Sequence, residues 1–105
     1  MNDGFIKVAA ATTDLKVADC AYNSSQIIAY AKEGAAHGAK LMVFPELCIT
    51  AYTCGDLFLQ RSLLEKAQEA LLSILQCTRD LSALLLVGLP VSYDGGLYNC
   101  AAVLY

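Results

Sequence analysis

The chain has no tryptophan, two prolines, one histidine and few charged residues. Only 16% of its 105 residues are charged, and its seven lysines and arginines are scattered singly. The net charge is −3, so there is no basic patch that could neutralise phosphates, and nucleic-acid binding is not expected. No apolar stretch reaches the ~18–20 residues of a membrane span, so no membrane partner is expected either.

Metal-binding and secretion signals are also missing from the sequence. The five cysteines contain no Cys-x-x-Cys pair, and His37 is far in sequence from the closest pair, Cys48 and Cys54. No zinc site is therefore predicted, and reduced thiols are the better interpretation. The first residues lack the positively charged segment of a signal peptide, which favours a cytoplasmic location.

Apolar residues, by contrast, are unusually abundant. Hydrophobic residues make up 57% of the chain, whereas an average domain is about 45–50% apolar. A part of a larger domain would show this excess, and so would a chain that buries one face in an oligomer. Composition therefore predicts one partial domain over residues 1–105, or obligate assembly.

The pattern of apolar residues predicts an α/β fold with the order β-α-β-α-β-β. Strands are expected at 5–13, 41–44, 83–89 and 97–105, and helices at about 19–38 and 62–80. Alternating strands and helices imply parallel strand pairs, with the first strand in a central position. Asp94-Gly95 predicts a final antiparallel hairpin, and Pro90 is expected to end the ladder of the third strand.

Several local predictions accompany this order. Asn23 is placed off the centre of the apolar stripe of the first helix, Gly38 is the expected stop of this helix, and His37 in its last turn is interpreted as structural. A short helix from Asp56 to Leu59 is also expected, with Asp56 as its cap rather than as a ligand. The stripe contains Cys20, Ser24, Ile27, Ile28, Ala31 and Ala35.

The strongest functional candidate is Glu46, which follows the apolar run 41–44 and Pro45. Open α/β sheets bind ligands at the carboxyl ends of their strands, where Glu46 is expected to lie. Partial burial beside Phe44 and Leu47 would raise its pKa and make it a plausible general base. A capping or surface-loop role is the alternative that the spacing alone leaves open.

Four ordered blocks resemble the nitrilase superfamily of carbon–nitrogen hydrolases, and within it the glutaminase domain of glutamine-dependent NAD synthetases. The first block is Phe44-Pro45-Glu46-Leu47 with Tyr52, and Gly55-Asp-Leu-Phe58 narrows the likeness to the synthetase branch. Val87-Gly-Leu-Pro90 and the block at 97–104 agree with it. One departure is Ala51, where the family usually has Gly before the tyrosine, so the turn there is expected to differ slightly.

The resemblance implies a fold, a reaction and roles for two residues. The fold is the N-terminal portion of a four-layer α-β-β-α sandwich, and the reaction uses a Glu-Lys-Cys triad to hydrolyse the side-chain amide of glutamine. Glu46 would be the base, and Tyr52 would help to position the substrate; the alternative for Tyr52 is a packed loop residue. No residue matches the family's catalytic Lys or nucleophilic Cys, so the chain alone is expected to be inactive.

The resemblance also implies partners that lie beyond these residues. Ammonia would pass to a second domain that amidates deamido-NAD with ATP and Mg²⁺, for which this sequence has no phosphate-binding loop. The expected partners are glutamine, the remainder of the same polypeptide and further copies of the chain. The alternatives are another amidase of the superfamily, or a non-catalytic α/β module used for binding or assembly.

Overall fold

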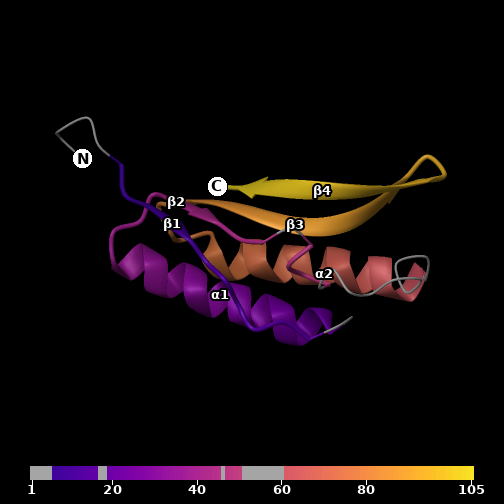
Figure 1. The fold of residues 1–105 in the computed structure, drawn as a ribbon, viewed down its shortest axis with the longest axis horizontal. Coiled ribbons are helices and arrows are strands. Elements are labelled where there is room, and N and C mark those ends of the chain that lie inside the picture. Colours follow the sequence, from indigo (N-terminus) through magenta and orange to yellow (C-terminus); the bar gives the residue numbers. More distant parts are fainter. Residues whose placement is uncertain (1–5, 17–18, 46, 51–60) are drawn as a thin grey trace.

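The computed structural model describes residues 6–16, 19–45, 47–50 and 61–105 of the chain. Two helices and four strands follow one another in the predicted order, as Figure 1 shows. The elements are β1 (Val8–Ala10), α1 (Cys20–Ala36), β2 (Leu41–Val43), α2 (Arg61–Thr78), β3 (Leu84–Tyr93) and β4 (Gly96–Leu104). The short helix predicted from Asp56 to Leu59 lies outside the described residues.

The four strands form one sheet in the order β1-β2-β3-β4. The pairs β1–β2 and β2–β3 are parallel, with Met42 level with Ala9 on one side and with Leu85 on the other. The predicted parallel pairing is therefore confirmed. The predicted central position of the first strand is wrong within the described residues, because β1 lies at the edge of the sheet and pairs with β2 alone.

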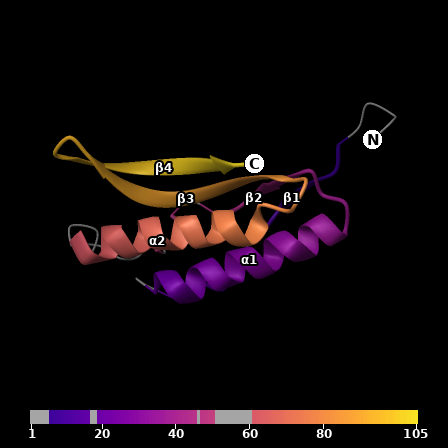
Figure 2. The ribbon, with the colours of Figure 1, turned by 180° about the vertical axis from the view of Figure 1, so that it is seen from behind.

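Both helices pack against the same face of the sheet, as the two opposite views in Figures 1 and 2 show. Side chains alternate between the faces of a strand, so Met42 and Leu85 share the helix-covered face and are almost fully buried. At Gly34 of α1 the helix comes close to β2, since a Cβ there would lie 2.5 Å from the Sδ atom of Met42. Glycine thus permits the close packing of α1 on the sheet.

The chain reverses between β3 and β4 in the predicted two-residue turn. Asp94 has a φ of +49° and Gly95 a φ of +79°, both in the left-handed region that such hairpin turns require. Tyr93 pairs directly with Gly96, and the antiparallel pairing continues to Leu85 and Leu104. The predicted hairpin is confirmed.

Pro90 does not end the ladder, contrary to the prediction from its missing N–H. It lies within β3 and is paired with Asn99 of β4. The carbonyls of Leu86 and Gly88 accept hydrogen bonds from Phe44 and Ile49, so these even-numbered positions direct their backbone groups toward β2. Backbone groups alternate along a strand, so the nitrogen of Pro90 also faces away from β4, past the end of β2, where no ladder bond is lost.

Helix α1 begins and ends as predicted. The carboxylate of Asp19 caps it by accepting a hydrogen bond from the backbone N–H of Tyr22 at 3.0 Å. At the other end Gly38 has a φ of +88° and donates its N–H to the carbonyl of Ala35. The ring of His37 makes a hydrogen bond of 2.9 Å between its Nδ1 atom and the backbone carbonyl of Glu33 in its own helix, as expected for a structural role.

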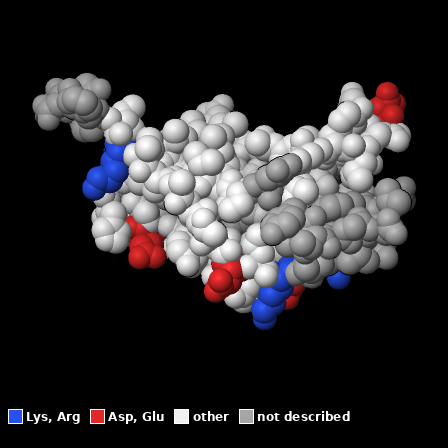
Figure 3. Space-filling view, in the orientation of Figure 1, with Lys and Arg blue, Asp and Glu red and all other residues white. Residues whose placement is uncertain are grey.

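The face of the sheet opposite the helices is apolar and carries no element of the described chain. Val8, Val43, Leu97 and Val103 are exposed. Figure 3 shows the molecule with the sheet edge-on; the charged side chains visible in this view lie along the helical layer and at the two ends. An exposed sheet face of this kind is typical of a surface that is covered by further protein.

We expect the isolated 105-residue chain to self-associate through this apolar sheet face. Val103→Lys on β4 should lower the association, because a charge on an apolar contact opposes burial. The control is Leu72→Lys on α2, since Leu72 is 57% exposed and Val103 is 51% exposed. Light scattering should show a smaller particle for the first variant only; a stable monomer for the unmodified chain would contradict the expectation.

Candidate functional site

The candidate site lies where the parallel strands β1 and β2 end. Parallel strands bring their carboxyl ends to one edge of the sheet, and two described segments meet there: residues 11–16 after β1 and residues 44–50 after β2, without Glu46. Glu46 and Tyr52, the predicted site residues, lie outside the described residues. Their roles therefore stay predictions, and the geometry concerns the residues that flank Glu46.

The segment after β2 consists of consecutive tight turns. The N–H of Cys48 donates to the carbonyl of Pro45, and the N–H of Thr50 donates to the carbonyl of Leu47, both at 3.2 Å. Leu47 has a φ of +52°, a left-handed conformation that is uncommon for a residue with a branched side chain. Such a conformation costs of the order of 1–3 kcal/mol and persists only where the surroundings hold it.

Strand β3 supplies part of that support. The carbonyl of Gly88 accepts hydrogen bonds from the N–H of Ile49 at 3.2 Å and from the Sγ–H of Cys48 at 3.7 Å. Cys48, Ile49 and Thr50 are completely buried. The turns that directly follow Glu46 in the chain are thus packed into the core rather than lying on the surface.

Helix α1 supplies the other part through Asn23, which is completely buried. Its Oδ1 atom accepts a hydrogen bond from the N–H of Lys16 at 2.8 Å, and its Nδ2 atom donates to the carbonyls of Lys16 at 2.9 Å and Ile49 at 2.8 Å. Asn23, which the sequence places off the centre of the apolar stripe, is nevertheless buried, because backbone groups of two loops satisfy its amide inside the core. Sequence reasoning did not single it out as a site residue.

Cys48 is the thiol nearest in sequence to Glu46, but its environment opposes nucleophilic chemistry. Burial raises the pKa of the Cys48 thiol to about 11, because the thiolate would lose its hydration. A catalytic cysteine needs a lowered pKa and access to its substrate. Cys48 is therefore a core residue.

Thr13 brings a buried hydroxyl to the segment after β1. Its residue exposure is 7%, and its Oγ1 atom has no hydrogen-bond partner, the one such buried side-chain atom within the part of the chain that the structure describes. A buried hydroxyl without a partner costs free energy, so its presence at this edge of the sheet is notable. No sequence pattern marks Thr13 as a site residue.

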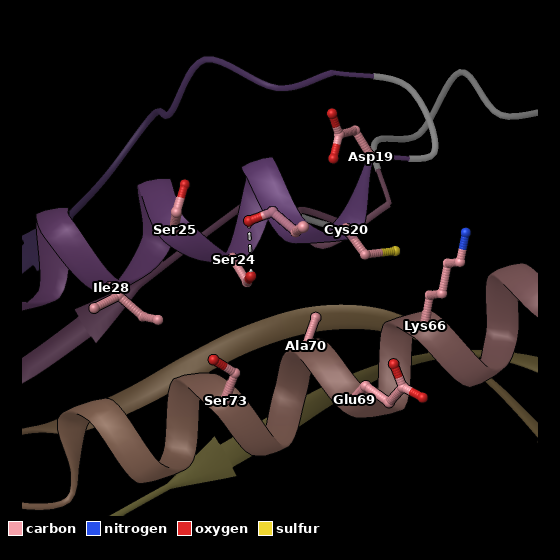
Figure 4. A pocket seen from close by; sticks show the side chains of 10 residues that line it. Asp19, Cys20, Ser24, Ser25, Ile28, Lys66, Glu69, Ala70 and Ser73 are labelled. Carbon is pink, nitrogen blue, oxygen red and sulfur yellow. Dashed lines mark hydrogen bonds between the residues drawn. The ribbon is translucent and has the colours of Figure 1, made fainter.

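Two hollows lie near these elements. One of about 260 Å³ opens on the bare sheet face and is lined in part by Val43, Pro45 and Asn99. The other, of about 700 Å³, lies between the helices and is drawn in Figure 4, where Ser24 and Ile28 come from α1 and Lys66, Glu69 and Ser73 from α2. Only the first hollow includes a residue adjacent in sequence to Glu46.

No group of three or more His, Cys, Asp and Glu side chains that could hold a metal occurs among the described residues. Among the same residues, no helix is long and apolar enough to cross a bilayer.

Comparison with known proteins gives the family. Residues 7–105 match the carbon–nitrogen hydrolase family, which is nearly the whole chain. The chain belongs to the carbon–nitrogen hydrolases. The motif around Phe44, Pro45 and Leu47 indicates this family in the sequence, and the family match agrees with it.

The curated relatives are glutamine-dependent NAD(+) synthetases. That of Mycobacterium tuberculosis is 37% identical over 102 residues, which are 97% of this chain and 15% of the relative. That of Xylella fastidiosa is 36% identical over 101 residues, 95% of this chain and 18% of the relative. The chain thus spans less than a fifth of the length of the relatives that it matches.

Solved structures agree on the fold. A glutamine-dependent NAD(+) synthetase from Cytophaga hutchinsonii superposes with a TM-score of 0.86 at 31% identity, covering 94% of this chain and 17% of the other. An amidase from Nesterenkonia superposes with a TM-score of 0.78 at 22% identity, over 93% of this chain and 37% of the amidase. The predicted fold class, a portion of a nitrilase-type α/β domain, is confirmed.

The raised pKa of Cys48 predicts slow alkylation and a pH-dependent stability. Between its ordinary value of 9.0 and about 11, the unfolded thiol ionises while the folded one stays protonated, so stability should fall as the pH rises through this window. Two pKa units correspond to about 3 kcal/mol. Denaturant unfolding at pH 8 and 10.5 would measure the loss, and Cys48→Ala should remove most of it.

Cysteine labelling gives an independent check on the same thiol. Iodoacetamide at pH 8 should modify the exposed Cys77 well before Cys48 in the folded protein. Mass spectrometry of the digested protein would rank the two sites. Rapid labelling of Cys48 would show that its thiol is accessible and contradict the buried position.

Thr13→Val should leave the folding stability unchanged or raise it by about 1 kcal/mol. The substitution removes a buried hydroxyl that has no partner and keeps the branched shape of the side chain. Thermal unfolding of both proteins would measure the change. The control is Thr78→Val, which removes a hydroxyl that donates to the carbonyl of Ile74 at 2.6 Å and should destabilise; an equal loss at Thr13 would reveal a partner there.

Proposed function

We propose that residues 1–105 form part of the glutaminase domain of a glutamine-dependent NAD synthetase. The observation that carries the proposal is the match over nearly the whole chain to such synthetases, at 37% identity for one sequence and with a TM-score of 0.86 for one structure. In this proposal the domain hydrolyses the side-chain amide of glutamine, and the ammonia serves a second domain that uses ATP and Mg²⁺.

Glu46 is the general base of the proposed reaction. It directly follows Pro45, which lines the hollow on the bare sheet face, and precedes the buried turns 47–50. A thiol nucleophile must lose a proton before it attacks the amide, and the later water must lose one to release glutamate. Tyr52 would position the glutamine. The lysine and the nucleophilic cysteine would come from other parts of the polypeptide.

The environment of Cys48 supports a reaction in which this chain provides the base and another part of the polypeptide provides the nucleophile. A thiol whose pKa is raised to about 11 holds its proton at neutral pH and is completely buried. Cys48 is thus not the nucleophile of the proposed reaction, and the base in this chain would serve a cysteine that the rest of the polypeptide provides. Because no residue of this chain matches the family's catalytic Lys or nucleophilic Cys, the 105-residue chain is expected to show no glutaminase activity by itself.

A different amidase of the same family is the second candidate. The Nesterenkonia amidase supports it, but at 22% identity this likeness shows the fold alone. The synthetases are more similar to this chain in sequence, and the Gly55-Asp-Leu-Phe58 block points to the same branch. The synthetase assignment is therefore the better supported of the two.

Glu46→Gln in the complete polypeptide tests the proposal. Ammonia release from glutamine should fall about 10²- to 10⁴-fold, because the amide cannot take up the proton. NAD formation from deamido-NAD with added ammonia should remain, since that reaction needs no glutaminase site. The matched control is Glu69→Gln on the exposed surface of α2, which should leave both rates unchanged. Wild-type glutamine hydrolysis by the Glu46 variant would refute the assignment of the base.

A further inference from the structure

Asn23 joins the two segments that meet at the candidate site. It lies in the first turn of α1, and α1 begins directly after the loop that follows β1. Its side chain is completely buried and holds Lys16 in that loop through two hydrogen bonds. Its third bond, from Nδ2 to the carbonyl of Ile49 at 2.8 Å, reaches the turns after β2.

Only an amide can make this set of contacts at that place. The Oδ1 atom accepts from one backbone N–H, while both hydrogens of Nδ2 donate to two backbone carbonyls. A carboxylate at position 23 would lack both donors and would face two carbonyl oxygens in a buried position. A serine hydroxyl has one hydrogen and could supply only one of the two donated bonds.

The bond to Ile49 acts on a segment that needs support. Leu47 has a φ of +52°, and Ile49 and Cys48 of the same segment also bond to the carbonyl of Gly88. Asn23 thus holds the segment from the helix side, while Gly88 holds it from the sheet. Two anchors from different elements define the position of a short segment far better than one does.

We propose that Asn23 is a positioning residue of the glutaminase site, a role that rests on the proposed function. Through Ile49 it fixes the turns that directly follow Glu46 in the chain, and through Lys16 it sets the loop after β1 beside them. It touches neither substrate nor a reacting atom. Displacing a catalytic group by about 1 Å can cost 10²-fold in rate, so loosening these turns should act on turnover.

The test compares Asn23→Ser with Ser24→Ala in the complete polypeptide. Ser24 is the next residue on α1, is also buried, and its hydroxyl bonds only to the carbonyl of Ala21 at 3.0 Å within the helix. For Asn23→Ser, kcat for glutamine should fall roughly 10- to 100-fold with a less than threefold change in KM. NAD formation with added ammonia should remain, and Ser24→Ala should keep the wild-type kcat.

A second measurement needs no variant and covers the case in which Asn23→Ser does not fold. In the folded wild-type polypeptide, hydrogen exchange at the amides of residues 47–50 should be as slow as in β3, because two elements hold that segment. Fast exchange there would overturn the proposal.

The remaining outcomes separate this inference from the function on which it rests. A folded Asn23→Ser protein with wild-type kcat would overturn it, and so would an equal loss of kcat in Ser24→Ala. If the wild-type polypeptide released no ammonia from glutamine, the proposed function would fail. The positioning role for glutaminase would then fall with it, whereas the exchange rates would still report whether Asn23 holds the turns.

Discussion

The parallel pairing of β1, β2 and β3 is the constraint on which the rest of the structure depends. It sets Ala9, Met42 and Leu85 side by side and directs the carboxyl ends of β1 and β2 to one edge. Parallel strands need long crossover connections, and the helices α1 and α2 occupy them. The loops before α1 and after β2 are therefore neighbours for a topological reason, although Lys16 and Ile49 are far apart in sequence.

The same pairing explains why so apolar a chain has an uncovered face. Both helices lie on one side of the sheet, and Met42 and Leu85 are buried beneath them. The opposite side chains, such as Val43 and Val103, are apolar and exposed. Parallel strands occur in sheets whose two faces are both covered by other elements. We therefore expect a second layer of protein over these residues. That expectation agrees with a chain that spans 15% of the length of a relative.

Much of the fold could be predicted from the sequence because local signals agree with it. The apolar stripes of the helices, the stop at Gly38 and the turn at Asp94-Gly95 all depend on residues close in sequence. Pro90 was predicted wrongly because its effect depends on which side of β3 its nitrogen faces. That side follows from the positions of β2 and β4 and is invisible in the segment itself.

For the candidate site, too, the sequence marks residues whose signal is local and does not mark residues whose contacts are distant in sequence. The Phe-Pro-Glu-Leu motif marks Glu46 in the sequence, since strand, proline and carboxylate are consecutive there. Asn23 carries no comparable mark, because its partners are backbone atoms of Lys16 and Ile49. Any residues could supply those atoms, so side-chain patterns do not reveal the contact.

The amide of Asn23 and the thiol of Cys48 show how the chain buries polar groups beside its candidate site. Asn23 is neutral and all the bonds described for it end on backbone atoms, so its burial removes no charge from water. Burial raises the pKa of the Cys48 thiol to about 11, so this thiol is neutral as well at neutral pH. The two buried groups therefore bring no charge to the turns after β2, and Glu46 is the one carboxylate in the sequence between Phe44 and Thr50.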